Sequence, residues 1–360
     1  MDEDCECGTF KRAYHQYISR KVLFVALCII VSIIGIGLEL STGAYDISFT
    51  ESYKVLIDHI LGNIPPDELG VGVDQIVWDL RFPRAIAGFV VGAGLGVCGA
   101  AMQSTMKNPL ADPYTTGISS GASLGATLSI VLGISIIPGM YGNTSIIFNA
   151  FLCSLIPAFV IVIISMFKKN TSPATMILIG VAVMYLFTAV TTLIKLTASE
   201  ESLAEIYIWN VGTLGKSSWD NVAYQVTATA FGIVSIMFLS KKLNILTMCD
   251  EGATSLGVNP KRTRLVVLII VSMVTSTLVA FAGTIGFVGL VSPHVVRLFL
   301  GSDNRYLAPA SAAFGAMLML CSDCLAKSIG TGLPVGVITA VLGGPLFLYL
   351  LVKQANRYRW

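Results

Sequence analysis

Long uncharged stretches separated by short polar segments are the main pattern along this chain. One stretch of 22 residues lies between Arg84 and Lys107. At 1.5 Å per residue, a helix of this length rises roughly 30 Å, the hydrocarbon thickness of a bilayer. The pattern therefore predicts a membrane-spanning helix over 84–106, with Pro83 in its first turn, where the missing N–H costs nothing.

Nine other spans bring the predicted number to ten. The 55 uncharged residues at 113–167 are too many for one helix, and PGMYGN at 138–143 divides them into two spans. The 32 uncharged residues at 265–296 also exceed one span, and Gly283 and Gly286 indicate a tight reversal between two helices. The other predicted spans are 22–38, 171–194, 221–240, 306–326 and 334–352, and the reversal separates 265–282 from 285–300.

Polar tails and loops frame a single transmembrane domain, predicted over 22–352. The tails are 1–21 and 353–360. The longest loop, 39–79, is acidic, and YKVLIDHIL at 53–61 within it has the spacing of a short amphipathic helix.

The segment 243–264 is too polar to cross a membrane and too apolar to be a loose linker. Its apolar positions follow helical spacing, at Leu246, Cys249, Ala253 and Leu256. Gly257 is a suitable helix stop, and a turn at 258–260 leads into a separate basic stretch. Such an element is expected to lie on the membrane face, where a soluble partner can contact it.

The composition fits a membrane protein built of helices. Hydrophobic residues make up 54% of the chain and charged residues only 12%, whereas soluble domains carry about 25% charged residues. Ten spans place both termini on one side, with 17 Lys and Arg residues on that side and 6 on the other, which together are the 23 of the chain. Positive charge accumulates on the cytoplasmic side, so we expect an all-α, multi-pass protein of the cell membrane, in contact with lipid and with both termini cytoplasmic.

Residues typical of catalysis are scarce. The three histidines, His15, His59 and His294, stand apart from any nucleophile or metal-ligand partner in the sequence. GTLGKSS at 212–218, in a polar loop predicted over 199–221 on the outer side, resembles a phosphate-binding loop but lacks its first glycine. We therefore expect no catalytic residues, no ATPase site, no cofactor and no nucleic-acid partner, with any ATP hydrolysis in a separate subunit.

The cysteines do not indicate a metal site either. Cys321 and Cys324 form a CxxC within a predicted span, where packing is the expected role rather than redox chemistry. Cys5, Cys7 and His15 form too small a set, too close to a terminus, so a tail without a metal is the prediction.

Arg81 and Arg84 flank Pro83 at the start of a predicted helix on the outer side. Cations at this position face the positive end of the helix dipole and run against the charge bias between the two sides. This placement suggests an acidic partner outside the membrane. Snorkelling to the interface, or local pairing with Asp74 or Asp79, explains it as well.

Asp323 is the one clear acidic residue inside a predicted span. Lys327 follows four residues later, so an i,i+4 ion pair near the helix end is the simplest prediction. A buried acid is also what a secondary transporter requires. That class is therefore kept as an alternative.

Several stretches occur in an order that resembles the FecCD-type permeases of iron-chelate and vitamin B12 importers. They are LRFPR at 80–84, MQ at 102–103, NPLADP at 108–113, GISSGA at 117–122, WNVGTLGKSSW at 209–219, DEGATSLGV at 250–258, GTIGFVGLVSPHVVRLFLGSDNRYLAP at 283–309 and LPVGVITAVLGGPLF at 333–347. These matches extend from about residue 78 to the end of the chain, whereas the first 77 residues match poorly.

The resemblance implies a type II ABC importer permease, a ten-transmembrane-helix bundle that usually works as a homodimer. It also implies two cytoplasmic ATPase subunits and a substrate-binding protein that docks outside. By resemblance the docking residues are Arg81, Arg84 and Lys327, the last standing where the vitamin B12 permease has arginine. The coupling helix that inserts into the ATPase is assigned by resemblance to 250–257, through Asp250, Glu251, Ala253, Leu256 and Gly257.

Transport by alternating access, with no bond in the substrate broken, follows from the same resemblance. Iron chelates, either siderophores or haem, are the expected substrates because they are the most frequent in the family. Cobalamin carried by the same machinery is the alternative. Selectivity in such importers lies mostly in the binding protein, so the permease sequence does not separate these substrates.

Overall fold

The computed structural model describes residues 3–43, 45, 47–63, 72–167, 172–329 and 332–357. Within these ranges the chain forms helices and turns and no strand, which confirms the predicted all-α class. The side chains of Cys5, Cys7 and His15 lie outside the described part of the chain. The helices are α1 (Glu3–Ser41), α2 (Phe49–Ile60), α3 (Val73–Gln75), η1 (Ile76–Arg81), α4 (Phe82–Met106), η2 (Pro113–Thr116), α5 (Ile118–Leu132), α6 (Gly142–Phe167), α7 (Pro173–Lys195), α8 (Glu200–Val211), α9 (Trp219–Leu246), α10 (Asp250–Ser255), α11 (Pro260–Ala282), α12 (Val288–Leu300), α13 (Asn304–Ile329) and α14 (Val335–Arg357).

Seven of the described helical segments are long and apolar enough to cross a membrane. They are Ile18–Ser41 of α1, the continuous helix Val73–Met106, and α6, α7, α9, α11 and α13. Three shorter apolar helices, namely α5, α12 and Val335–Tyr349 of α14, occupy the other predicted positions. The break predicted at 138–143 lies after the end of α5, and the reversal predicted at Gly283 and Gly286 lies between α11 and α12.

The helices extend beyond several of the predicted spans, because hydropathy marks the membrane and not the ends of helices. α1 already begins at Glu3, inside the predicted tail, and α9 continues past two lysines to Leu246. α11 begins at Pro260, so the basic stretch predicted as a separate segment forms its first turns. The loop predicted over 199–221 contains α8, which Ser199 caps by accepting a backbone N–H of the first turn.

Pro83 is the second residue of α4, in its first turn as predicted, but the chain is already helical before it. The helix is continuous from Val73, and the π-helical segment η1 ends two residues before the proline. In η1 the amide of Phe82 donates to the carbonyl of Val77, five residues back. A local change to π-helical bonding is one way in which a helix accommodates a residue without an N–H.

α4 packs on α13 through glycines. A Cβ added at Gly92 would lie 2.3 Å from the carbonyl oxygen of Gly315, and one added at Gly96 would lie 2.1 Å from that of Ser311. Real Cβ atoms do not approach this closely, so only glycine allows the two backbones to lie at this separation. Helices in lipid associate through such contacts. The small-residue packing predicted from the glycine spacing is therefore present.

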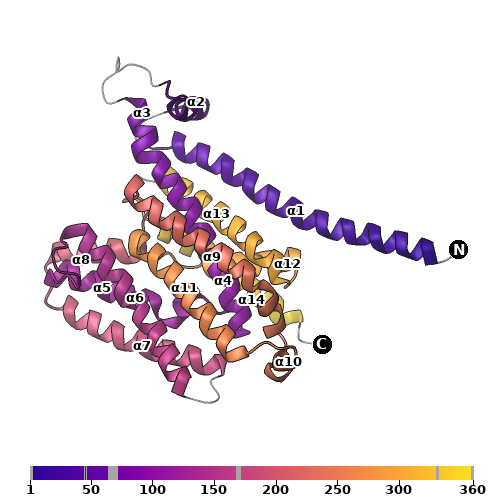
Figure 1. Cartoon of the computed structure of the whole chain (residues 1–360). Coiled ribbons are helices and arrows are strands. Elements are labelled where there is room, and N and C mark those ends of the chain that lie inside the picture. The colour runs from indigo at the N-terminus through magenta and orange to yellow at the C-terminus, as the bar shows by residue number, and fades with distance from the viewer. Residues whose placement is uncertain are drawn as a thin grey trace.

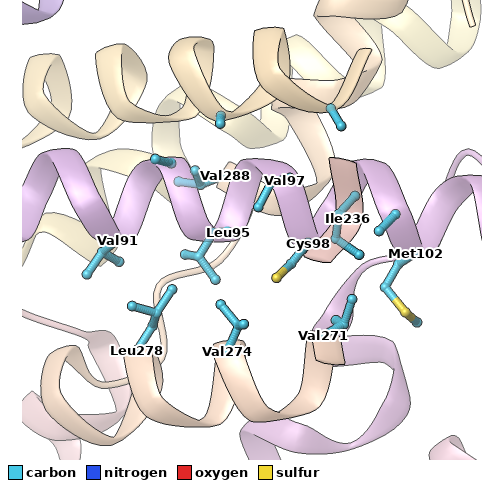
Figure 2. Packing of buried hydrophobic residues seen from close by; sticks show 14 of the residues in the cluster. Val91, Leu95, Val97, Cys98, Met102, Ile236, Val271, Val274, Leu278 and Val288 are labelled. Atoms are coloured by element: carbon cyan, nitrogen blue, oxygen red, sulfur yellow. The ribbon is translucent and has the colours of Figure 1, made fainter. Parts of the chain in front are cut away.

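The opposite side of α4 packs against α11. Figure 2 shows Leu95 and Cys98 of α4 beside Leu278 and Val274 of α11, and none of these four side chains is more than 2% exposed. In the hydrophobic stretch of the helix Val73–Met106, 89% of the residues are buried. α4 is thus the central helix of the bundle.

The two ends of the bundle carry different short helices. Figure 1 shows α2 and α3 at one end and α10 at the other. α2 contains the amphipathic helix predicted at 53–61 and begins with a capping box between Ser48 and Glu51. Its Leu56 is buried in a cluster with Leu40 at the end of α1. α4 connects these two ends.

Candidate functional site

Arg84 and Asp323 form an ion pair between α4 and α13. Nε of Arg84 donates to Oδ2 of Asp323 at 2.8 Å, and Nη2 donates to Oδ1 at 2.7 Å. The Asp323 side chain is 1% exposed and the Arg84 side chain 21%. Two parallel bonds fix the guanidinium and the carboxylate in one plane. The predicted pair between Asp323 and Lys327 is wrong, because this carboxylate faces the neighbouring helix.

Lys327 contacts Glu39 near the end of α1. Its Nζ donates to Oε2 of Glu39 and lies 3.3 Å from the carbonyl oxygen of the same residue. The Glu39 side chain is fully buried and that of Lys327 is 10% exposed. Burial of a carboxylate is costly without a counter-charge. The sequence interpretation missed Glu39, although an acid directly after the apolar run 22–38 is a signal that could have been used.

Arg81 holds the C-terminal end of α1. Nη1 donates to the carbonyls of Leu40 at 2.6 Å and Ser41 at 3.0 Å, and Nη2 donates to that of Tyr45 at 2.6 Å. The residue is 7% exposed. A cation at the C-terminus of a helix is electrostatically favourable, so Arg81 stabilises the end of α1. Asp74 is one of the two acids that the sequence suggested as local partners of the arginines. Its Oδ1 lies 2.9 Å from Nδ1 of His59.

The structure therefore brings two of the three predicted docking residues into one group of four charges. We call it the N-terminal charge cluster, after its place on α4; it consists of Arg84, Asp323, Lys327 and Glu39. The cluster contains two basic and two acidic side chains. Arg81 lies beside this cluster, because it binds the carbonyl of the residue that follows Glu39.

A second cluster lies at the other end of α4, around Asp250 at the start of α10. Nη1 and Nη2 of Arg264 donate to Asp250 at 2.7 and 2.6 Å, and Nζ of Lys107 donates at 3.0 Å. Hydrogen bonds from Arg264 hold the pKa of the Asp250 carboxyl well below its usual range. These three residues form the C-terminal charge cluster. The sequence interpretation selected Asp250 but neither cation.

α10 presents part of the predicted coupling set to solvent. Glu251 and Leu256 are exposed, the latter 58%, whereas Ala253 is fully buried. Cys249 caps the helix, with its Sγ 3.4 Å from the amide nitrogen of Gly252. Gly257 ends it at φ +78°, as predicted, a conformation that favours glycine.

A hollow of about 1070 Å³ adjoins α10 and the first turn of α11. Its lining includes Glu251, Thr254 and Lys261. A second hollow, of about 510 Å³, lies between α6, α8 and α11 and is lined by Glu205 and Lys216 among others. Lys216 belongs to GTLGKSS, which follows the helix α8, whereas a phosphate-binding loop follows a strand.

Comparison with known proteins relates this chain to transport proteins. The sequence model described as the FecCD transport family matches residues 27–353. The cobalamin import system permease protein BtuC of Halobacterium salinarum is 40% identical over 78% of this chain and 74% of its own length. The Fe(3+)-citrate import system permease protein YfmD of Bacillus subtilis is 35% identical over 94% of this chain and 96% of its own.

A solved structure supports the same relationship. It is assigned to the metal-chelate type ABC transporters, in an inward-facing conformation, and it superposes with a TM-score of 0.79 at 27% identity. The superposition covers 91% of this chain and 98% of the other. The family comprises multi-pass permease subunits of ABC importers that work with separate ATPase and substrate-binding proteins and lack an ATPase site themselves. This chain belongs to the FecCD transport family.

Proposed function

We propose that this chain is the membrane-spanning subunit of an ATP-driven importer of iron chelates, either siderophores or haem. One observation carries the proposal, namely that a single buried helix, α4, has a charge cluster at each end. The chain crosses the cell membrane ten times with both termini in the cytoplasm. Substrate arrives from a binding protein outside and passes inward by alternating access.

The N-terminal charge cluster is the docking site for the binding protein in this proposal. Arg84 and Lys327 make the contact, and acidic groups of the binding protein compete with Asp323 and Glu39 for them. Arg84 is the better placed of the two, because its side chain is the more exposed. Arg81 acts indirectly, since its bonds to three carbonyls hold the end of α1 against α4.

α10 is the contact with the ATPase. Its exposed residues Glu251 and Leu256 and the adjoining hollow support this role, because an inserted helix needs a free face. Asp250 and Ala253 hold the helix on the permease, and Gly257 allows the chain to turn into α11.

The importer contains two copies of this chain in the proposal. α7 supports a copy-to-copy or lipid contact, because only 17% of its hydrophobic stretch is buried within the chain. Leu178, Tyr185 and Leu193 of α7 are each more than 65% exposed. Native mass spectrometry of the purified importer is expected to find two copies, and a single copy would contradict the homodimer.

The alternatives differ in what they need from the chain. Import of cobalamin uses the same machinery, and one of the relatives carries that substrate in its name. A secondary transporter needs an acid that is free to bind a proton or ion. Asp323 is disfavoured for that task because Arg84 neutralises it through two hydrogen bonds.

Uptake in a strain lacking this chain tests the proposal. Labelled ferric siderophore, haem and cobalamin are offered separately, with and without the restored protein. We expect loss of iron-chelate uptake that the restored protein repairs. Loss of cobalamin uptake alone would transfer the proposal to the alternative substrate. Uptake that persists when the ATPase subunits are absent would contradict an ABC mechanism.

A charge exchange tests the docking site. Arg84→Asp combined with Asp323→Arg keeps an ion pair between α4 and α13 but moves the cation to the buried position. We expect the double variant to assemble and to lose binding-protein affinity and uptake. Normal uptake by the assembled double variant would show that Arg84 serves only the fold.

A further inference from the structure

Arg264 is buried between three elements at the end of α4. It lies in the second turn of α11 and is 2% exposed. Two of its nitrogens bind Asp250 of α10, and Nε donates to the carbonyl of Thr105 in α4 at 3.4 Å. One guanidinium thus joins α10, α11 and α4.

Lys107 makes a second connection to the same carboxylate. It ends α4 in the left-handed conformation, at φ 51°, which is uncommon for a residue other than glycine. Its Nζ lies 3.0 Å from Oδ1 of Asp250 and also contacts the carbonyl of Met248, just before α10. The start of α10 is therefore tied to the end of α4 through Asp250 and the residue Met248 just before the helix.

A hydrogen-bond network of polar side chains ties this turn of α4 to two further helices. Ser104 donates to Oδ1 of Asn304 at 2.7 Å, and Nδ2 of Asn304 donates to Oδ1 of Asn244 at 2.9 Å. Asn244 in turn donates to Asp303 at 2.7 Å. A displacement that reaches the last turn of α4 is therefore shared with α9 and α13.

The geometry requires an arginine at position 264. A guanidinium has a rigid fork of donors that can bind a carboxylate with two bonds and a carbonyl with a third. A lysine at this position would keep the charge but could not make the same planar contacts. α10 has only six residues, so the charge cluster, rather than its own length, fixes its direction.

We propose that Arg264 is a positioning residue that transmits the movement of α10 to α4. Lys107 provides a second connection between the same two helices. This inference rests on the proposed function, because the movement of α10 originates in the ATPase. α4 is buried, and at about 1.5 Å per residue its 25 residues reach roughly 37 Å to the N-terminal charge cluster. Arg264 would thereby connect ATP hydrolysis to the docking end.

The test uses the complete importer, with ATPase subunits and binding protein, reconstituted in liposomes. Basal ATPase activity, its stimulation by the binding protein, and uptake per ATP hydrolysed are measured with a ferric hydroxamate siderophore and with cobalamin in turn. For Arg264→Lys we expect assembly and basal activity to be retained. Uptake per ATP should fall about tenfold, within the range typical of coupling between two sites.

Arg262→Gln is the matched control, because Arg262 lies in the first turns of α11 but is exposed. It removes one positive charge without reaching the C-terminal charge cluster, so uptake per ATP should stay at the wild-type value. Lys107→Gln provides a second test at a partly exposed site, and a smaller loss of coupling in the same direction is expected.

Three results would be informative. Unchanged uptake per ATP in both Arg264→Lys and Lys107→Gln would overturn this inference and leave the proposed function intact. If Arg264→Lys does not assemble, Lys107→Gln alone decides, and unchanged coupling there also overturns the inference. A wild-type importer that shows no stimulation and no uptake would instead refute the proposed function.

Discussion

Substitution of Gly96 by alanine tests the central packing of α4 on α13. The added Cβ would lie 2.1 Å from the carbonyl oxygen of Ser311, whereas ordinary contact begins at 3.4 Å. The two backbones must therefore separate by about 1.3 Å, and no flexible side chain can yield in their place. Overpacking of this kind costs about 3 kcal/mol at the upper end of the usual range. Alanine has a higher helix propensity than glycine, which offsets about 1 kcal/mol of this cost. The expected net loss of stability is therefore roughly 2 kcal/mol.

The expected change in unfolding temperature follows from the size of the chain. An unfolding entropy of about 2.1 cal/mol/K per residue gives about 0.76 kcal/mol/K for the 360 residues. A net loss of 2 kcal/mol then lowers the midpoint by about 3 °C. The assay is thermal unfolding of the detergent-purified protein, followed by the fraction that remains monodisperse or by tryptophan fluorescence.

Gly88 of α4 supplies the matched control. A Cβ there would meet Cδ1 of Leu214 at 3.3 Å and Cδ2 of Leu320 at 3.4 Å, and both are the ends of flexible side chains. Gly88→Ala is therefore expected to change the midpoint by about 1 °C or less, since propensity and crowding nearly cancel. If Gly96→Ala is as stable as Gly88→Ala, the close approach of α4 and α13 is wrong.

Three further predictions concern charged and reactive groups. Lys327→Gln leaves Glu39 buried without its counter-charge and should destabilise the protein by about 3–5 kcal/mol. Thermal unfolding of the double variant Lys327→Gln with Glu39→Gln should show that part of this stability is recovered. No recovery in the double variant would contradict the ion pair. Hydrogen bonds from Arg305 lower the pKa of Asp303 to about 2, so this carboxylate stabilises the fold above its unfolded value of about 3.9 and ceases to do so as the pH falls through about 2. Acid unfolding curves should therefore show a smaller loss of stability between these values for Asp303→Asn, and parallel curves would refute the role. Cys249 is exposed and offers a test of the proposed orientation. In a variant with Cys5→Ser and Cys7→Ser, a membrane-impermeant maleimide should label Cys249 in inside-out vesicles and not in intact cells. Labelling of Cys249 in intact cells would reverse the proposed orientation.

The positions of the helices could be predicted from the sequence because charge is excluded from hydrocarbon. The uncharged runs and the break at 138–143 locate the apolar helices correctly. The same physics fails at helix ends, since a lysine at a membrane surface can extend its ammonium to water without ending the helix. α9 passes its two lysines and runs to Leu246 for this reason.

The charged residues of the candidate site could be selected from the sequence, but not their partners. The i,i+4 rule is local and suggested Lys327 for Asp323, whereas the structure selects Arg84, 239 residues away along the chain. Arg264 belongs to the stretch that the sequence predicts as a separate basic segment, because nothing local distinguishes a buried guanidinium from an exposed one. Such ion pairs depend on which helices lie next to each other in space, and the hydropathy pattern does not contain that information.

The contact between Glu39 and Lys327 has a consequence for the synthesis of the protein. The two residues are 288 positions apart, so α1 enters the membrane long before its counter-charge exists. At about 5–20 residues per second, roughly 14 to 58 s separate the two events. During that time Glu39 must remain protonated, in contact with water, or sheltered by the insertion machinery. Completion of α13 therefore supplies the contact that holds the end of α1 in place.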